Sequence, residues 1–357
     1  MLSPAQQPPQ KSARRRLSAR LAPVLGVLLG LSALQKADAQ APTPFRPYSE
    51  TAKSAVLPGR EGWLFLSSEL HFLSAPEFWG AAASAVSKAS NPDWADPLPA
   101  ILDFHAQLKA HGIQLLVVPV PPKAALYPEQ LPALEDSTPA PTPGQVPSLA
   151  GFYKVLEKEG VQVLDLVPVL LENRKSEHGP AFCTTDSHWS GNACVLAAQA
   201  ISQRITALLP ASLRNPFSAE WKSASFRGDL PDLPGAPASG SPQETLPVRR
   251  ILHESSGAVS PDPDSPLLLI GDSHTLVFHD FLAENAGLLD QLAFETALAP
   301  DLIGTRGSGA TPVRISLLRR SVKDPGFLSK KKVVVWCFSA REFTESESGW
   351  QKVAVSR

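Results

Sequence analysis

Short apolar runs alternate along the chain with segments whose apolar residues recur at helical spacing. Runs bounded by turn residues, typical of buried strands, occupy residues 113–118, 161–166, 267–270 and 333–338. The helical pattern occupies residues 101–109, 149–158, 193–209, 275–286 and 313–322. Strands and helices in alternation build a parallel sheet covered by helices. We therefore predict an α/β fold in which one parallel sheet is flanked by helices.

Two proline-rich stretches, residues 137–147 and 231–247, interrupt this pattern. Strands on both sides of each stretch are needed to complete one sheet, so we predict surface loops there and not domain boundaries. The 357 residues are sufficient for one large domain with a substantial core.

The first forty residues differ from the rest of the chain. Basic residues up to Arg20 precede an apolar stretch at residues 21–34, and Ala37-Asp38-Ala39 follows. This layout is typical of a secretory signal peptide, residues 1–39. An uncleaved anchor is the alternative, but the stretch is shorter than the roughly 17 residues that a spanning helix needs. Residues 40–58 are rich in proline and polar residues and predict a linker, so the folded domain is expected at residues 59–357.

Charge and cysteine content narrow the function classes. The formal net charge is −1, and the body of the chain has no recurring basic cluster, which argues against nucleic acid as a partner. In an exported protein, Cys183 and Cys194 can form a disulfide that braces the segment between them, or both can be buried free thiols, as we expect for Cys337. The spacing of the cysteines and histidines predicts no metal site.

A serine, a histidine and an aspartate stand in positions that suit acyl transfer. Asp186 and His188 lie two residues apart in TTDSHWS, and Ser273 follows the predicted strand in PLLLIGDSHT. A serine hydroxyl becomes a good nucleophile when an imidazole takes its proton, and a carboxylate fixes the tautomer of that imidazole. Side chains two apart in an extended segment point to the same side, so Asp186 can bind one ring nitrogen while the other faces Ser273. This chemistry requires no cofactor.

Simpler interpretations exist for each element. Ser273 or Asp272 alone can be a helix cap, and the Asp186–His188 segment can be a turn that leads into a helix capped by Ser190. The adjacent His274 is poorly placed as a base for Ser273, and we expect it to line the cleft or to be exposed. The three residues together favour the catalytic hypothesis.

Further candidates follow from the rule that ligands bind beyond the carboxyl ends of parallel strands. Lys123 and Arg341 each follow a predicted strand there and are substrate-binding or oxyanion candidates. The backbone N–H of Ser273, at the start of a helix predicted near residue 275, is the first expected oxyanion donor. Arg306, in the turn Gly304-Thr305-Arg306-Gly307, is a candidate for the second donor unless that segment is only a surface turn.

The motifs resemble the SGNH-hydrolase-like domain of the alginate O-acetyltransferases, the AlgJ/AlgX family. The resemblance rests on GREGWLFL, VVPVPPKAALYPE, TTDSHWS, FRGDLPDL, LLIGDSHT and VVVWCFSAREF, which occur in the order of the family across nearly all of the chain after the linker. It implies Ser273 as nucleophile, His188 as base and Asp186 as its partner. One departure is His274, where the family usually has an aromatic residue.

The resemblance also implies a function. A periplasmic enzyme of this type moves an acetyl group through an acyl-serine onto hydroxyls of an exported, alginate-like polysaccharide. The acetyl donor is expected to come from a membrane-bound O-acyltransferase, which is therefore an implied partner. A carbohydrate acetyl esterase with the same three residues, and a noncatalytic polysaccharide-assembly subunit, remain as alternatives.

Overall fold

The computed structural model describes residues 43–134, 140–211, 215–238 and 243–357. Residues 41–357 form one compact unit. The predicted signal peptide, residues 1–39, lies outside the described residues. Among the residues that the structure describes, no helix has both the length and the apolar composition of a membrane-spanning segment.

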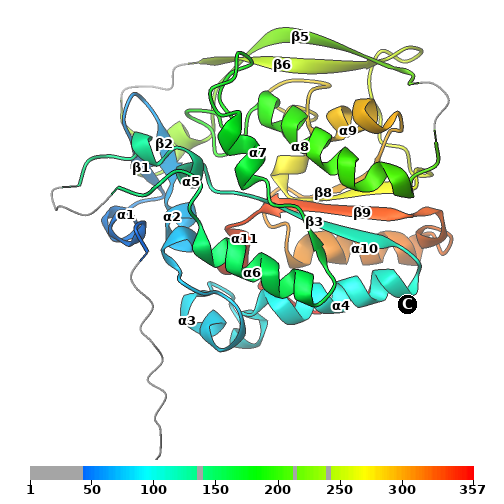
Figure 1. The fold of residues 1–357 in the computed structure, drawn as a ribbon, viewed down its shortest axis with the longest axis horizontal. Coiled ribbons are helices and arrows are strands. Elements are labelled where there is room, and N and C mark those ends of the chain that lie inside the picture. The colour runs from blue at the N-terminus through cyan, green and yellow to red at the C-terminus, as the bar shows by residue number, and fades with distance from the viewer. Residues whose placement is uncertain (1–42, 135–139, 212–214, 239–242) are drawn as a thin grey trace, which may run out of the picture. The chain divides into compact units, whose positions relative to one another are not determined.

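A parallel sheet of five strands forms the centre of this unit (Figure 1). Its order is β4 (Gln162–Val163), β3 (Gln114–Val120), β9 (Val333–Ser339), β7 (Leu267–Gly271) and β8 (Asp301–Gly304), and every neighbouring pair is parallel. The predicted α/β fold is thus confirmed. β8 was not predicted, because four residues that begin with Asp301 carry too little apolar pattern to mark a strand.

The central strands are buried on both faces, and alternate residues serve opposite cores. In β9, Val334, Trp336 and Phe338 belong to one hydrophobic cluster, whereas Val333, Val335 and Cys337 belong to the other. Period-two side-chain direction explains this division. The first cluster packs against α4 (Pro97–Ala110), α6 (Pro147–Lys158) and α10 (Thr311–Lys323). The second packs against α7 (Val167–Glu172), α8 (Gly191–Ile205) and α9 (Leu288–Thr296), so the sheet lies between two helical layers (Figure 1).

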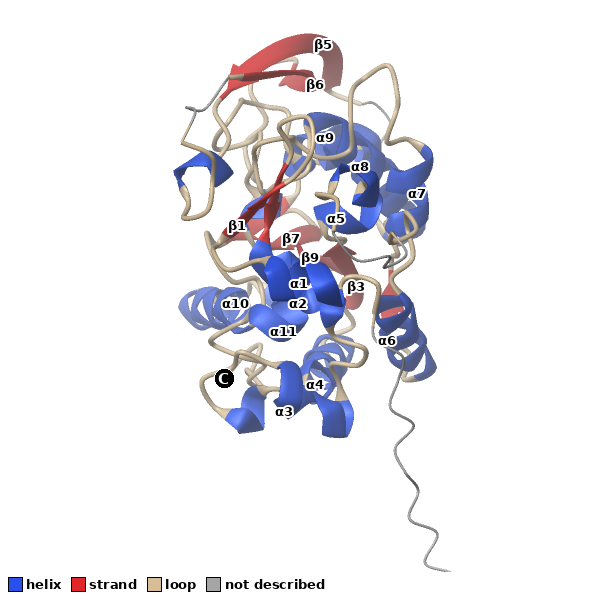
Figure 2. Ribbon diagram, turned by 90° about the vertical axis from the view of Figure 1, so that its left-hand side faces the viewer, coloured by secondary structure: helices blue, strands red, loops and turns tan. Residues whose placement is uncertain are grey.

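A two-stranded antiparallel ribbon lies beyond α8 and α9 (Figure 2). It consists of β5 (Phe217–Phe226) and β6 (Glu244–His253). The prediction of a surface loop at residues 231–247 is therefore wrong for its last residues, since Pro247 lies inside β6 opposite Ser223. A two-stranded ribbon has no central strand, so a proline within it breaks no sheet interior.

The predicted linker at residues 40–58 is corrected by the structure. Helix α1 (Arg46–Thr51) and strand β1 (Val56–Pro58) belong to the fold, and β1 pairs with β2 (Leu64–Leu66). Phe45 and Tyr48 are 2% and 6% exposed and join the first core cluster. The sequence analysis missed these two buried aromatic residues because the stretch is rich in proline and polar residues. Short helices complete the architecture: α2 (Ser67–Ser74), α3 (Ala83–Val86), α5 (Lys123–Leu126) and α11 (Glu342–Glu345).

The helix predicted at residues 275–286 is wrong. Only a short 3₁₀ turn, Ser273–Thr275, follows β7, and the next regular element is α9. Phe278, Leu282 and Asn285 adopt positive φ angles, which a right-handed helix cannot contain. The apolar side chains at helical spacing are buried by an irregular segment instead.

Truncation of Phe45 tests whether residues before 59 belong to the fold. We expect Phe45→Ala to lower the free energy of unfolding by about 3 kcal/mol, because a buried aromatic side chain is lost from the core. Urea denaturation of the protein measures this change. The matched control is Glu50→Ala on the exposed face of α1, and equal stability of the two variants would contradict the assignment.

Candidate active site

The end of strand β7 carries Ser273 at the carboxyl edge of the sheet. Asp272 holds this turn in place, because its Oδ1 accepts the His274 N–H at 2.9 Å and its Oδ2 accepts the Ser339 N–H at 2.7 Å. The second bond ties the turn to the end of the neighbouring strand β9. Asp272 is fully buried, whereas Ser273 is partly exposed. The carboxylate therefore anchors the turn from the interior of the protein, while the serine remains accessible.

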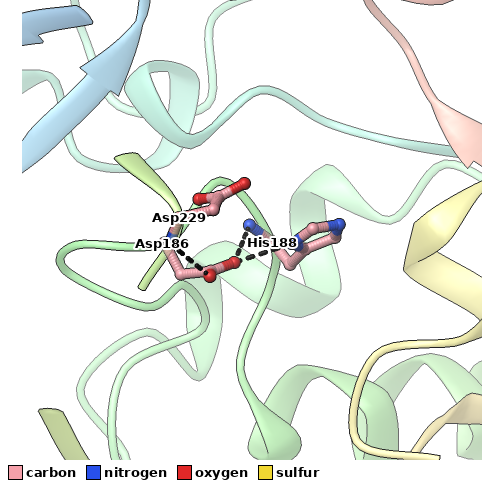
Figure 3. A group of neighbouring side chains, drawn as sticks. All are labelled: Asp186, His188 and Asp229. Atoms are coloured by element: carbon pink, nitrogen blue, oxygen red, sulfur yellow. Dashed lines mark hydrogen bonds and ion pairs between the residues drawn. The ribbon is translucent and has the colours of Figure 1, made fainter. Parts of the chain in front are cut away.

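Asp186 and His188 lie on a tight loop between α7 and α8. An isolated antiparallel bridge between Phe182 and Trp189 closes this loop, and Ser190 then caps α8 by accepting the Ala193 N–H at 3.3 Å. Asp186 Oδ1 lies 2.7 Å from His188 Nδ1 and also accepts the His188 N–H at 2.9 Å (Figure 3). The carboxylate therefore sets both the ring and the backbone of the histidine.

The structure brings this loop to Ser273 from 85 residues away in the sequence. His188 Nε2 lies 2.7 Å from Ser273 Oγ. As whole residues, Asp186 and His188 are 1% and 7% exposed. This continuous hydrogen-bonded chain from carboxylate to imidazole to hydroxyl is the geometry that nucleophilic serine chemistry requires. If Ser273 and Asp186 only capped turns, there would be no reason for His188 to bond to both of them.

Burial and hydrogen bonding act in opposite directions on the two buried carboxylates. Burial alone would raise the pKa of Asp186, but the hydrogen bond and charge of His188 and the N–H groups of His188 and Asp229 outweigh it and lower the pKa. Asp272 behaves alike: its interactions with His274 and the Ser339 N–H outweigh burial, and the pKa is lowered. Both carboxylates are therefore held in the ionised form.

Asp229 was not singled out from the sequence, although it lies in the motif FRGDLPDL. Its N–H donates to Asp186 Oδ2 at 3.0 Å, and its carboxylate accepts the Ser187 N–H at 2.7 Å and the Ser187 hydroxyl at 2.6 Å. The preceding Gly228 packs against Thr185 so closely that an added Cβ would lie 2.2 Å from the Thr185 carbonyl oxygen. The glycine thus allows Asp229 to reach the loop of Asp186 and His188.

Glu244 at the start of β6 also supports this loop. Its carboxylate accepts the N–H groups of Thr184 at 2.6 Å and Thr185 at 3.1 Å. Sequence reasoning missed Glu244 because it placed the residue in a surface loop.

Asp186, His188 and Asp229 place potential metal-ligand atoms within 4.8 Å of one another (Figure 3). Each of these atoms already has a partner: Ser187 occupies both oxygens of Asp229, the Asp229 N–H and His188 occupy those of Asp186, and Ser273 faces His188 Nε2. We therefore interpret the group as a hydrogen-bond network that orients His188.

The structure gives Lys123 a different place from the predicted one. Its ammonium is buried and donates to the carbonyl oxygens of Asp186 at 2.6 Å, Leu64 at 2.9 Å and Thr184 at 3.3 Å. These bonds use its three donors, so Lys123 does not face a substrate. Burial lowers the pKa of Lys123, while Glu69 and other nearby acids oppose this effect. Lys123 supports the backbone of the loop that carries Asp186 and His188.

The proposed bridge between Cys183 and Cys194 is not formed. Both thiols are free and fully buried in the second core cluster, and Cys183 Sγ donates to the Trp189 carbonyl oxygen at 3.5 Å. Cys337 is also free and buried, as expected. Hydrogen bonds with Lys123, Asp229 and Glu244 hold the loop in place of a covalent link.

Arg341 and Arg306 have different surroundings. Arg341 is partly buried, lies 3.6 Å from Glu69 and donates to the Ser339 hydroxyl at 3.1 Å, so it supports the end of β9. Arg306 is exposed, and its guanidinium carbon lies 4.8 Å from the ring centre of Phe281. The Phe281 ring in turn lies 5.5 Å from that of His188. Arg306 is thus the predicted candidate that is exposed, and Phe281 lies between it and the histidine.

Ser273 also offers its backbone amide. Across the described ranges, the Ser273 N–H has no hydrogen-bond acceptor, whereas Asp272 accepts the next two amides of the turn. The oxyanion donor predicted at this position is therefore free, although it comes from a single 3₁₀ turn and not from a long helix.

His274 is neither exposed nor placed in the open part of the site. It is 1% exposed, its Nδ1 lies 3.1 Å from Asp272 Oδ1, and its ring lies 4.9 Å from that of His188. Burial lowers its pKa against the opposing effect of Asp272, which favours a neutral ring beside His188. Trp189 is fully buried against His274, with 5.7 Å between the rings.

Comparison with known proteins places this geometry in a family. The sequence profile described as "SGNH hydrolase-like domain, acetyltransferase AlgX" matches residues 56–303. The chain belongs to this family. It is by this membership an O-acetyltransferase, which confirms the resemblance seen in the motifs.

Curated relatives agree with this assignment. The protein named "Probable alginate O-acetylase AlgJ" from Pseudomonas aeruginosa is 25% identical over 318 residues, which cover 81% of this chain and 70% of that protein. The protein of the same name from Pseudomonas putida is 26% identical over 310 residues, covering 83% and 72%.

Solved structures of two such proteins share the fold. The O-acetyltransferase domain of Pseudomonas putida AlgJ superposes with a TM-score of 0.61 at 22% identity, over 81% of this chain and 92% of that domain. Pseudomonas aeruginosa AlgX gives a TM-score of 0.56 at 14% identity, over 80% of this chain and 62% of AlgX.

Replacement of Lys123 tests its supporting role. We expect Lys123→Met to lower the free energy of unfolding by about 3 kcal/mol, because buried carbonyl oxygens lose their donor. Turnover of the folded variant should fall at least tenfold, because the Asp186 backbone is no longer fixed. Thermal unfolding and ester hydrolysis below the transition measure both effects. The control Lys109→Met removes an exposed lysine of α4; if the two variants behave alike, Lys123 has no such role.

Proposed function

We propose that the protein transfers an acetyl group, through an acyl-serine at Ser273, onto hydroxyls of an exported alginate-like polysaccharide. The observation that supports this proposal most strongly is the Asp186–His188–Ser273 hydrogen-bond chain in a member of an acetyltransferase family. A noncatalytic assembly subunit would have no use for this aligned set.

The first half-reaction acetylates the serine. Ser273 Oγ attacks the carbonyl carbon of the acetyl donor while His188 Nε2 takes the hydroxyl proton. The Ser273 N–H donates to the developing oxyanion. As the bond to the donor breaks, His188 returns its proton to the leaving group, and Asp186 stabilises the imidazolium that exists in between.

The second half-reaction regenerates the enzyme. A sugar hydroxyl approaches the acyl-serine, gives its proton to His188 Nε2 and attacks the acetyl carbon. The ester bond to Ser273 breaks and the serine oxygen takes the proton from His188. Arg306 is exposed, and within the described ranges its guanidinium has no hydrogen-bond partner, so its donors would bind oxygens of the acceptor next to this hydroxyl.

The acceptor, the donor and the location are part of the same proposal. The names of the AlgJ relatives support an alginate-like acceptor. A membrane-bound O-acyltransferase would supply the acetyl group, and the protein would act in the periplasm after removal of residues 1–39. The basic and apolar segments at the start of the sequence support export.

Removal of the Ser273 hydroxyl tests the nucleophile. The mature protein should release nitrophenol from nitrophenyl acetate in a burst, and Ser273→Ala should reduce the rate by about 10³-fold or more, since the triad acts as a unit. Stopped-flow absorbance follows the burst. Ser255→Ala, at an exposed serine, serves as control. A rate in Ser273→Ala equal to that of the wild type would remove Ser273 from the mechanism.

Acceptor addition separates transfer from hydrolysis. With nitrophenyl acetate as donor and oligomannuronate as acceptor, mass spectrometry should show products heavier by one acetyl group, because a bound sugar hydroxyl competes with water for the acyl-serine. Product formation should depend on His188 as well as on Ser273. Release of acetate alone at saturating acceptor would identify an esterase.

A further inference from the structure

A second buried histidine, His274, lies beside the base of the proposed reaction. It is 1% exposed, and its ring centre lies 4.9 Å from that of His188, with 55° between the ring planes. Aromatic rings at such separations interact through their π electrons. His274 is therefore a direct neighbour of the ring that becomes positively charged when Ser273 loses its proton.

Asp272 fixes the tautomer of His274. An ionised carboxylate only accepts hydrogen bonds, so the His274 Nδ1, at 3.1 Å from Asp272 Oδ1, carries the proton. The other ring nitrogen, Nε2, is buried and has no hydrogen-bond partner among the residues that the structure describes. A second proton would place an N–H there without an acceptor, which is costly for a buried donor. The ring is therefore held neutral, with its hydrogen bond directed to a negative charge.

The surroundings of His274 also favour the neutral ring. Burial lowers its pKa most, Asp272 opposes this effect, and the positive charges of His188 and Arg341 lower the pKa further. Trp189 is fully buried, with 5.7 Å between its ring and that of His274, and it adds no charge. The attraction between a cation and π electrons is stronger in such a desolvated place than at an exposed site.

The other ring beside His188 is already engaged with a cation. Phe281 lies 5.5 Å from His188 between ring centres, but the guanidinium carbon of Arg306 lies 4.8 Å from the centre of the same Phe281 ring. A cation within about 6 Å of an aromatic ring is attracted by its π electrons, so Arg306 and an imidazolium would share Phe281. His274 differs, because its bond to a carboxylate polarises the ring toward higher electron density.

We propose that His274 is a positioning residue that stabilises the imidazolium of His188: its neutral ring, made electron-rich by the hydrogen bond to Asp272, attracts the positive charge that His188 acquires. His274 acts through His188 and exchanges no proton itself. The proton moves from Ser273 Oγ to His188 Nε2 and on to the leaving group, while His274 keeps its own proton on Nδ1. This inference rests on the proposed function, because it needs His188 as the base of Ser273.

Two substitutions separate the ring from its hydrogen bond. His274→Phe keeps an aromatic ring and His274→Leu does not, while both lose the bond to Asp272. We expect the burst rate at saturating nitrophenyl acetate to fall about threefold in His274→Phe and at least tenfold in His274→Leu, because the imidazolium loses part or all of its π partner. The half-saturating concentration of the ester should stay unchanged in both.

The pH profile distinguishes this role from a merely structural one. The acid limb of kcat/KM reports the protonation of His188 in the free enzyme. Without its partner ring His188 binds a proton less readily, so the acid limb should move to lower pH by about half a unit or more in His274→Leu, and by less in His274→Phe. A loss of packing alone would lower the rate without this shift.

The control His111→Leu removes an exposed histidine that follows α4 and should keep the wild-type burst and acid limb. Thermal unfolding shows whether each variant is folded. If folded His274→Leu keeps the wild-type acid limb, or if His274→Phe reacts no faster than His274→Leu, His274 does not stabilise the imidazolium.

The wild-type protein offers a test that requires no stable variant. Nitrogen-15 NMR of the histidine rings should show His274 neutral, with its proton on Nδ1, throughout the pH range in which His188 gains its proton. Protonation of His274 before His188 would overturn the inference. The two proposals fail separately: a burst that is lost in Ser273→Ala supports the proposed function whatever His274 does, whereas a burst that persists there removes the proposed function itself.

Discussion

A buried carboxylate must have its oxygens satisfied by hydrogen-bond donors, and Asp186 imposes this requirement on the whole site. The donors come from its own loop, through His188, and from Asp229 in the segment that follows β5. Lys123 holds the carbonyl oxygen of the same residue from the end of β3. The loop of Asp186 and His188 is therefore held by tertiary contacts, from Lys123 at the sheet edge and from Asp229 and Glu244 near the ends of the ribbon.

Two Asp-Ser-His units face each other across the site, and they have the same local geometry. In each, the aspartate Oδ1 accepts both the backbone N–H and the Nδ1 contact of the histidine two residues later. Their serines differ in partner: Ser187 is bound by Asp229, whereas Ser273 is directed to His188. The hydrogen bond from the Ser339 N–H anchors Asp272 to β9 and keeps the second unit fixed, so that His188 of the first unit faces the Ser273 hydroxyl of the second.

The sequence was sufficient where one local pattern determined one outcome. Apolar runs such as residues 333–338 have no alternative to a buried strand, and parallel strands gather their carboxyl ends, so Ser273 and Lys123 could be placed at a common edge. It was insufficient where burial or long-range contact decides. The sequence reveals the charge of Lys123 but not the three carbonyl oxygens to which it donates. It also does not reveal that Asp229 and Glu244, which follow β5 in the chain, bind the loop of Asp186 and His188. At residues 275–286 the helical spacing is real, but left-handed φ angles at Phe278 and Leu282 bury the same side chains without a helix.

That irregular segment brings Phe281 to His188 while remaining outside the sheet and the helices. Its ends are fixed by local contacts, with the Ala286 N–H on the Phe278 carbonyl oxygen at 2.8 Å and the Gly287 N–H on Asp290 at 2.9 Å. The Phe281 side chain itself belongs to no strand or helix, so an exchange at this position alters the surroundings of His188 without removing a hydrogen bond of the Asp186–His188–Ser273 chain.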